Sequence, residues 1–265
     1  MLDANNLTLT FNKNTPIETK ALRGLTLNIP QGQFVTVIGS NGAGKSTFLN
    51  AISGEQKVDS GTIKIDGQDV TKKNSWQRSE SVARVFQDPM AGTCERLTIE
   101  ENLALASARN QSRGLSPASN HTLRKEFKKI LSRLELNLEN RLSDRIGLLS
   151  GGQRQAISLL MATMRPSKIL LLDEHTAALD PKTAAFVLAL TDSIVNESGL
   201  TTMMVTHSMR QALDHGHRTI MLHQGKVVLD VAGEDRKGLT VNDLLQMFEK
   251  VRGETLDDDS LLLSN

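Results

Sequence analysis

The sequence has a single cysteine, Cys94, and no tyrosine, and only 3% of its 265 residues are aromatic. One cysteine excludes an intrachain disulfide, which favours a reducing compartment such as the cytosol. The N-terminus lacks the basic and apolar regions of a secretory signal, and no segment approaches the ~20 apolar residues of a membrane-spanning helix. We therefore expect any role at a membrane to depend on docking to a protein that spans it.

An excess of charge of one sign is also missing, because 31 lysine and arginine residues face 30 aspartate and glutamate residues, for a formal net charge of +1. This balance argues against nucleic acid or an anionic membrane surface as the main partner. The length allows a large core and lies at the upper edge of single-domain size. We expect one domain and no nucleic-acid partner.

Strand patterns dominate the first third of the chain and return in the last third. Phe34–Ile38 is an apolar, β-branched run that we expect to be buried on both faces, as in a central parallel strand. Further strands are predicted at Leu7–Phe11, Leu25–Ile29, Val82–Phe86, Lys168–Leu172, Thr202–Thr206 and Thr219–Leu222, with hairpin turns at Ser60–Gly61, Asp66–Gly67 and Gln224–Gly225. Helices are predicted at Ser46–Ile52, Lys182–Glu197, Met209–His215 and Thr240–Val251. The alternation of strands and helices after Pro166 predicts a parallel sheet with right-handed crossovers.

Long helical patterns replace strands in residues 88–164. Thr98 and Glu101 form a capping-box pattern that opens a helix reaching Ala108. Leu123–Leu134 carries apolar residues on one face and Lys and Arg on the other, which is most simply interpreted as a solvated face. A polar linker is predicted between these helices, at Asn110–Asn120.

A glycine-rich segment follows the strand predicted at Phe34–Ile38. Gly39–Ser46 fits the phosphate-binding loop pattern G-x-x-x-x-G-K-[ST], in which backbone N–H groups and a helix N-terminus bind phosphate oxygens. Lys45 is predicted to contact the β- and γ-phosphates, Ser46 to ligate Mg²⁺, and Thr47 to donate to a phosphate. The other loop residues predicted to contact the nucleotide are Gly39, Ser40, Asn41, Gly42, Ala43 and Gly44.

Two adjacent acids, Asp173 and Glu174, end the aliphatic run Ile169–Leu172. Ligands bind at the carboxyl ends of buried strands in doubly wound sheets. Asp173 is therefore predicted to hold Mg²⁺, and Glu174 to act as the general base that activates the attacking water. Two acids at a helix start also serve as a simple cap, but a phosphate loop in the same chain favours the catalytic interpretation.

Between these two motifs lies Leu149–Gln153, with the sequence Leu-Ser-Gly-Gly-Gln. A serine beside two glycines at a helix start is an anion-binding arrangement on its own terms. In this position, however, the segment resembles the signature of ATP-binding cassette (ABC) ATPases. The resemblance spans about residues 5–230, and it implies that four residues contact ATP held by a second subunit: Ser150, Gly151, Gly152 and Gln153.

The resemblance assigns roles to four further residues. Gln87 would contact the metal and the attacking water, and His207 would bond the γ-phosphate and stabilise charge in the transition state. Asp180 would reach across the dimer interface to the opposite phosphate loop. Phe11 would stack on adenine, with a core position in its own strand as the alternative interpretation of this residue.

The chain departs from the family pattern at His175, where most relatives have proline after the catalytic glutamate. Histidine restores a backbone N–H and adds a titratable group beside the site. The change removes no catalytic atom, and it leaves the stiffness of this loop as an open question.

Together these features predict the α/β class: a P-loop NTPase core with a parallel sheet, an N-terminal antiparallel β subdomain and an inserted α-helical subdomain. We expect one ABC ATPase domain over residues 1–253. Its parts would be a core at 1–87 and 165–230, a helical subdomain at 88–164 and a C-terminal helix at 231–253, followed by a disordered tail at 254–265.

The resemblance implies an ATPase subunit of a bacterial importer that uses ATP and Mg²⁺ as a homodimer, on the inner face of the plasma membrane. Its expected partners are an integral membrane permease and a substrate-binding protein. Gln87–Pro89 and Asp173–Ala178 favour permeases of the branched-chain type and an amino acid as solute. Two alternatives stay open: an ABC exporter, lipoprotein-release or cell-division ATPase, and a soluble ABC protein acting on nucleic acid or ribosomes. The solute itself is not predicted, because it never touches this subunit.

Overall fold

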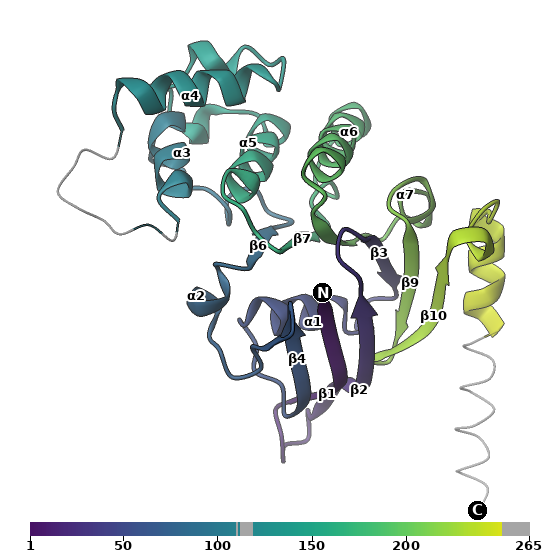
Figure 1. Cartoon of the computed structure of the whole chain (residues 1–265). Helices are drawn as coiled ribbons and strands as arrows, with labels where there is room; N and C mark the ends of the chain where they lie inside the picture. Colours follow the sequence, from purple (N-terminus) through teal and green to yellow (C-terminus); the bar gives the residue numbers. More distant parts are fainter. Residues whose placement is uncertain (110, 112–118, 251–265) are drawn as a thin grey trace, which may run out of the picture.

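Two β-sheets form the framework of the chain in the computed structural model, which describes residues 1–109, 111 and 119–250 (Figure 1). The first sheet is antiparallel and has the order β2-β1-β4-β5. Its strands are β1 (Leu2–Phe11), β2 (Thr19–Ile29), β4 (Ser60–Ile65) and β5 (Gln68–Asp69). This arrangement confirms the predicted N-terminal antiparallel part of an α/β fold.

The second sheet has the order β10-β9-β3-β8-β7-β6, and every neighbouring pair in it is parallel except β9 and β10. Its strands are β3 (Phe34–Gly39), β6 (Val82–Val85), β7 (Ile169–Asp173), β8 (Thr201–Val205), β9 (Arg218–His223) and β10 (Lys226–Ala232). The predicted parallel sheet is therefore confirmed, with one antiparallel strand at its edge.

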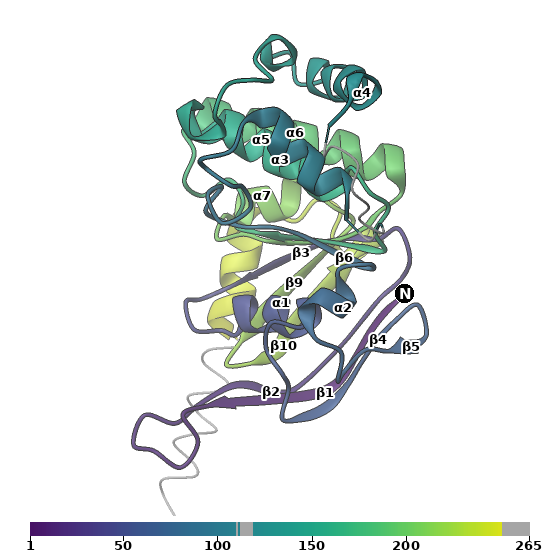
Figure 2. The ribbon, with the colours of Figure 1, turned by 90° about the vertical axis from the view of Figure 1, so that its left-hand side faces the viewer.

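The parallel sheet is covered on both faces. Helix α1 (Lys45–Ser53) lies between the two sheets, whereas α3, α5 and α6 lie beyond the parallel sheet (Figure 2). In β7, Ile169 and Leu171 belong to the core on the α1 side, and Leu170 and Leu172 to the core on the other side. Successive strand residues point to opposite faces, so a strand between two layers is buried at every position, as β7 is. Phe34–Ile38 is buried throughout for the same reason, as predicted.

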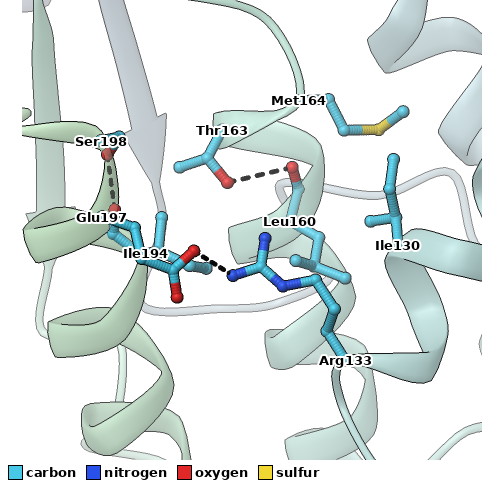
Figure 3. A pocket seen from close by; sticks show the side chains of 8 residues that line it. All are labelled: Ile130, Arg133, Leu160, Thr163, Met164, Ile194, Glu197 and Ser198. Atoms are coloured by element: carbon cyan, nitrogen blue, oxygen red, sulfur yellow. Dashed lines mark hydrogen bonds and ion pairs between the residues drawn. The ribbon is translucent and has the colours of Figure 1, made fainter.

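Three helices cover the far face of the parallel sheet, and a fourth lies outside them, against α3 (Figures 1 and 2). The three are α3 (Ile99–Ser107), α5 (Gly151–Thr163) and α6 (Pro181–Ser198), and the fourth is α4 (His121–Ser132). The apolar face of α4 is inward, with Phe127 and Leu131 fully buried. Arg133, directly after α4, forms an ion pair of 2.5 Å with Glu197 of α6 beside a cleft of about 340 Å³ between α4, α5 and α6 (Figure 3). Both partners are half exposed, so the pair contributes little to stability.

Most of the helix starts and turns predicted from short sequence patterns are found in the structure. Thr98 Oγ1 accepts from Glu101 N–H while a Glu101 carboxylate oxygen accepts from Thr98 N–H, which confirms the capping box. The predicted turn at Ser60–Gly61 is wrong, because these residues begin β4. Ser60 pairs there with Thr8 of β1, and a hydrogen bond of 2.7 Å between the two hydroxyl groups joins the strands.

The remaining elements are short. They are α2 (Ser75–Arg78), α7 (Met209–Asp214), 3₁₀ turns at Leu138–Asn140, Ile146–Leu148 and Gly233–Asp235, and a helix at 241–250. Thr240 and Asp243 cap that last helix reciprocally. Most of the linker predicted at Asn110–Asn120 and the whole tail at 254–265 lie outside the described residues. Within the described ranges, no helix has the length and hydropathy to cross a bilayer.

Candidate nucleotide-binding site

The loop between β3 and α1 holds Lys45 in the first turn of a buried helix. Lys45 is buried, and its Nζ donates to the main-chain carbonyl oxygens of Gly39 (2.7 Å) and Ser40 (3.0 Å). Burial lowers the pKa of Lys45, and the nearby carboxylates of Glu174 and Asp173 oppose that effect. The ammonium group therefore lies inside the loop, within the field of both acids.

Gly44 ends this loop with a geometry that a side chain would not permit. Its φ is +99°, in the left-handed region, and a Cβ there would lie 2.6 Å from the carbonyl oxygen of Ala21 on β2. Both observations require glycine. No side chain caps α1, so its first N–H groups are available to an anion, as at other helix N-termini.

A cleft of about 290 Å³ opens beside the loop. It is lined by Phe11, Thr19, Ala21, Asn41, Gly42, Ala43, Gly44, Lys45, Ser46, Thr47, Glu174 and His207. Most of the predicted site residues thus meet in one place. Phe11 both lines the cleft and packs against the core, so its two interpretations are compatible. The sequence analysis did not predict Thr19 and Ala21, because they belong to no motif and lie in the part of β2 that precedes the predicted strand Leu25–Ile29.

Glu174 and His207 meet because β7 and β8 are parallel neighbours. Asp173 is in register with Val205, so the residues after both strands emerge at the same edge. His207 Nε2 lies 2.6 Å from Glu174 Oε1. Glu174 has a φ of +47°, which is uncommon for a residue with a side chain. The proposed base therefore stands on a strained backbone, in contact with the predicted switch histidine.

Asp173 has a partner that the sequence analysis missed. Arg84 of β6 donates to Asp173 Oδ2 at 2.6 Å, and to Asn50 and Glu55 at 2.7 Å each. Its guanidinium also lies over the Phe86 ring, 4.8 Å from the centroid. One signal in the sequence could have revealed this contact. Arg84 is a charged residue inside a strand whose other residues are apolar, and such a charge needs a buried partner.

Mg²⁺ takes oxygen ligands and usually keeps several waters beside one or two carboxylates and the substrate phosphates. The donors offered here are the Ser46 hydroxyl, the Asp173 carboxylate and the Gln87 amide. Val85 pairs with Leu172, so the residues after β6 lie beside the ends of β7 and its following turn. This set of hard oxygen donors fits Mg²⁺.

The signature segment lies at the start of α5. Ser150 Oγ accepts from Gln153 N–H, and Gln153 Oε1 accepts from Ser150 N–H. A Cβ on Gly152 would lie 1.9 Å from Thr183 Cγ2 of α6, so this glycine allows the two helices to approach. None of these signature residues lines the cleft beside Lys45.

Asp180 caps the neighbouring helix α6, where its carboxylate accepts from Thr183 N–H at 3.1 Å. Hydrogen bonds from Thr183, first through its side chain and then its backbone, lower the pKa of Asp180. Asp180 and Gly152 therefore both lie against Thr183, and neither of them lines the nucleotide cleft of the same chain.

Comparison with known proteins agrees with this architecture. The model of the ABC transporter family matches residues 22–177. The tyrosine transport ATP-binding protein of Clostridioides difficile is 45% identical over 249 residues, 94% of this chain and 99% of that protein. A methionine import ATP-binding protein of Streptococcus agalactiae is 32% identical, over 91% of this chain and 68% of that protein. The chain belongs to the ABC transporter family, and it is an ATPase subunit coupled to transport.

Solved structures are similar across the whole cassette. A dimeric ATP-binding cassette in a post-hydrolysis state with ADP and Pi has a TM-score of 0.75 and 31% identity, covering 88% of this chain and 98% of that one. A nucleotide-free ATP-binding cassette from an ABC transporter has the same TM-score and 25% identity, covering 89% of this chain and 92% of that one. The fold predicted from the motifs is thus confirmed.

Proposed function

We propose that this chain is the ATPase of a bacterial importer, in which two copies sandwich two ATP molecules. One observation carries the proposal: the phosphate loop and the signature belong to one chain, yet the signature residues contribute nothing to that chain's own nucleotide cleft. A second copy supplies the missing half if its Ser150 and Gly152 face the cleft. Because each chain has both halves, a homodimer has two competent sites.

Within each site, Lys45 would exchange the carbonyl oxygens of Gly39 and Ser40 for phosphate oxygens. Glu174 would accept a proton from the attacking water. His207, now bonded to Glu174, would turn to the γ-phosphate and stabilise developing charge. Mg²⁺, when held by Ser46, Asp173 and Gln87, supplies positive charge that neutralises the phosphate oxygens.

The surface formed by the residues after β6 is the proposed docking site for the membrane partner. Asp88 and Cys94 are exposed, and the segment between them joins Gln87 to the helical region. We propose that a permease in the plasma membrane docks there, which would hold this chain at the inner face of the membrane. Relatives named for tyrosine transport and methionine import support an amino acid as the solute. We further propose a substrate-binding protein as a partner, because a separate importer subunit of this kind requires its solute to be delivered to the permease.

The Glu174→Gln variant tests the sandwiched site. Loss of the base should raise the barrier by ~3–5 kcal/mol, about 10²–10⁴ in rate, while the phosphate contacts remain. ATP should then trap a closed dimer that size-exclusion chromatography separates from the monomer, and a second substitution, Ser150→Arg, should abolish it. Hydrolysis at the parental rate, or an ATP-independent elution volume, would contradict the proposal.

Importer and exporter differ in the permease. Purification of the tagged chain from membranes of the source bacterium should recover a permease and, after cross-linking, a substrate-binding protein. Recovery of a lipoprotein-release or cell-division membrane protein, or of ribosomes, would instead support one of the two alternative functions.

A further inference from the structure

His175 follows the proposed base directly, and its ring is buried, with 2% of its surface exposed. His175 Nε2 lies 3.1 Å from Thr191 Oγ1 in the middle of α6. The Thr191 hydroxyl donates to the Val187 carbonyl oxygen at 2.8 Å. Since its only hydrogen is used there, Thr191 Oγ1 is the acceptor, and the proton of the imidazole is on Nε2.

This contact involves a neutral ring. Burial lowers the pKa of His175 to about 4, and the charge of nearby His215 adds to that effect. His215 is itself held by Asp192, the residue after Thr191, at 2.7 Å. Two successive residues of α6 therefore each hold one histidine, and only the first of these histidines belongs to the turn that carries the proposed base.

The backbone of Glu174 needs such a restraint. Its φ of +47° costs energy for a residue with a Cβ and persists only where the surroundings fix it. Glu174 N–H donates to the Val205 carbonyl at 3.0 Å, and Ala177 N–H donates to the Glu174 carbonyl at 2.9 Å. Those bonds fix the turn to β8 and to itself, and neither of them fixes it to α6.

We propose that His175 is a positioning residue whose ring, anchored to Thr191, holds Glu174 in the conformation in which its carboxylate reaches His207 and the nucleotide cleft. A proline at this position would stiffen the turn through its own ring, and here a side-chain hydrogen bond does so instead. The proposal rests on the role of Glu174 as the base.

Two substitutions break the link from either end in the full-length protein. His175→Leu fills the buried position with an apolar side chain that has no hydrogen-bond donor. Thr191→Val preserves the β-branched shape but removes the hydroxyl that accepts the bond. We expect each to lower kcat at least tenfold while the Kd for ADP stays within twofold. The double variant should be no slower than the slower single variant, because both remove the same bond. His175→Gln, whose amide can donate to Thr191, should recover most of kcat.

Thr163→Val is the matched control, because the Thr163 hydroxyl also bonds a carbonyl four residues earlier in its helix but lines the cleft beside the C-terminal end of α6 (Figure 3). Three outcomes would overturn the positioning role. His175→Leu could keep the parental kcat, the losses in the double variant could be additive, or ADP binding could weaken with no rescue by glutamine. Failure of the underlying function is distinguishable, since Glu174→Gln would then hydrolyse ATP at the parental rate.

Discussion

The contact between Gly152 and Thr183 yields a prediction that the structure makes quantitative. A Cβ at Gly152 would lie 1.9 Å from Thr183 Cγ2 and 3.3 Å from Thr183 Cβ, whereas a Cβ at Gly151 would lie 3.6 Å from Leu179 Cδ2, an ordinary contact. Gly152→Ala and Gly151→Ala therefore add the same methyl group to adjacent positions of one helix, and they differ chiefly in this clash.

Alanine in place of glycine in a helix stabilises by ~0.5–1 kcal/mol, and both variants share that gain. Overpacking costs ~1–3 kcal/mol. The contact with the Thr183 methyl group is the severe one, because a β-branched side chain in a helix is restricted to few rotamers, whereas the 3.3 Å contact with its Cβ needs only a small shift. We therefore expect Gly152→Ala to be less stable than Gly151→Ala by about 2 kcal/mol, or roughly 4–8 °C in Tm for a chain of this size.

Thermal unfolding followed by circular dichroism measures this difference in the full-length protein. Thr183→Ser removes the methyl group involved, so adding it to Gly152→Ala should recover most of the lost stability, whereas adding it to Gly151→Ala should not stabilise. Equal melting temperatures for the two alanine variants, or no recovery with serine, would refute the close packing of α5 on α6.

Three further predictions concern the site and its partners. Arg84→Met leaves the Asp173 carboxylate largely buried without its cation, which should cost on the order of 3 kcal/mol in chemical denaturation; unchanged stability would show that the ion pair is dispensable. Ser150→Arg and Lys45→Ala should each abolish hydrolysis, and mixing the two proteins should restore partial activity through one intact site per mixed dimer. Mixing that restores no activity would show that the two chains do not share their sites. Labelling of Cys94 by a thiol reagent should slow when the permease is bound; equally fast labelling with and without it would move the docking surface elsewhere.

Much of the fold follows from local patterns. The aliphatic runs at Phe34–Ile38 and Ile169–Leu172 predict strands buried on both faces, since each must contact a layer on either side. The phosphate loop and the acid pair are short segments whose order along the chain predicts the carboxyl edge of a parallel sheet. Their meeting with His207 depends only on neighbouring parallel strands, and so this part of the site was within reach of the sequence.

The interactions that the sequence does not reveal join residues that are distant along the chain. Arg84 and Asp173 are 89 positions apart, and their contact depends on the order of β6 and β7 in the sheet. The error at Ser60 has a similar origin, because a Ser-Gly pair predicts a turn until Thr8 of β1 is known to lie opposite. His175 stood out as a departure, but its partner in α6 could be found only from the packing of that helix.

Helix α6 gives these separate observations a common basis. Near its start Thr183 contacts Gly152 of the signature segment, in its middle Thr191 holds His175 beside the proposed base, and near its end Glu197 pairs with the helical region. A single helix therefore touches the signature segment proposed to face the second copy, the turn that carries Glu174, and the helical region at the end of α4. Coupling between distant sites requires an element whose position both sites bias. Because α6 is continuous across all three contacts, we expect a shift of the signature segment to reach the base through the bond between His175 and Thr191.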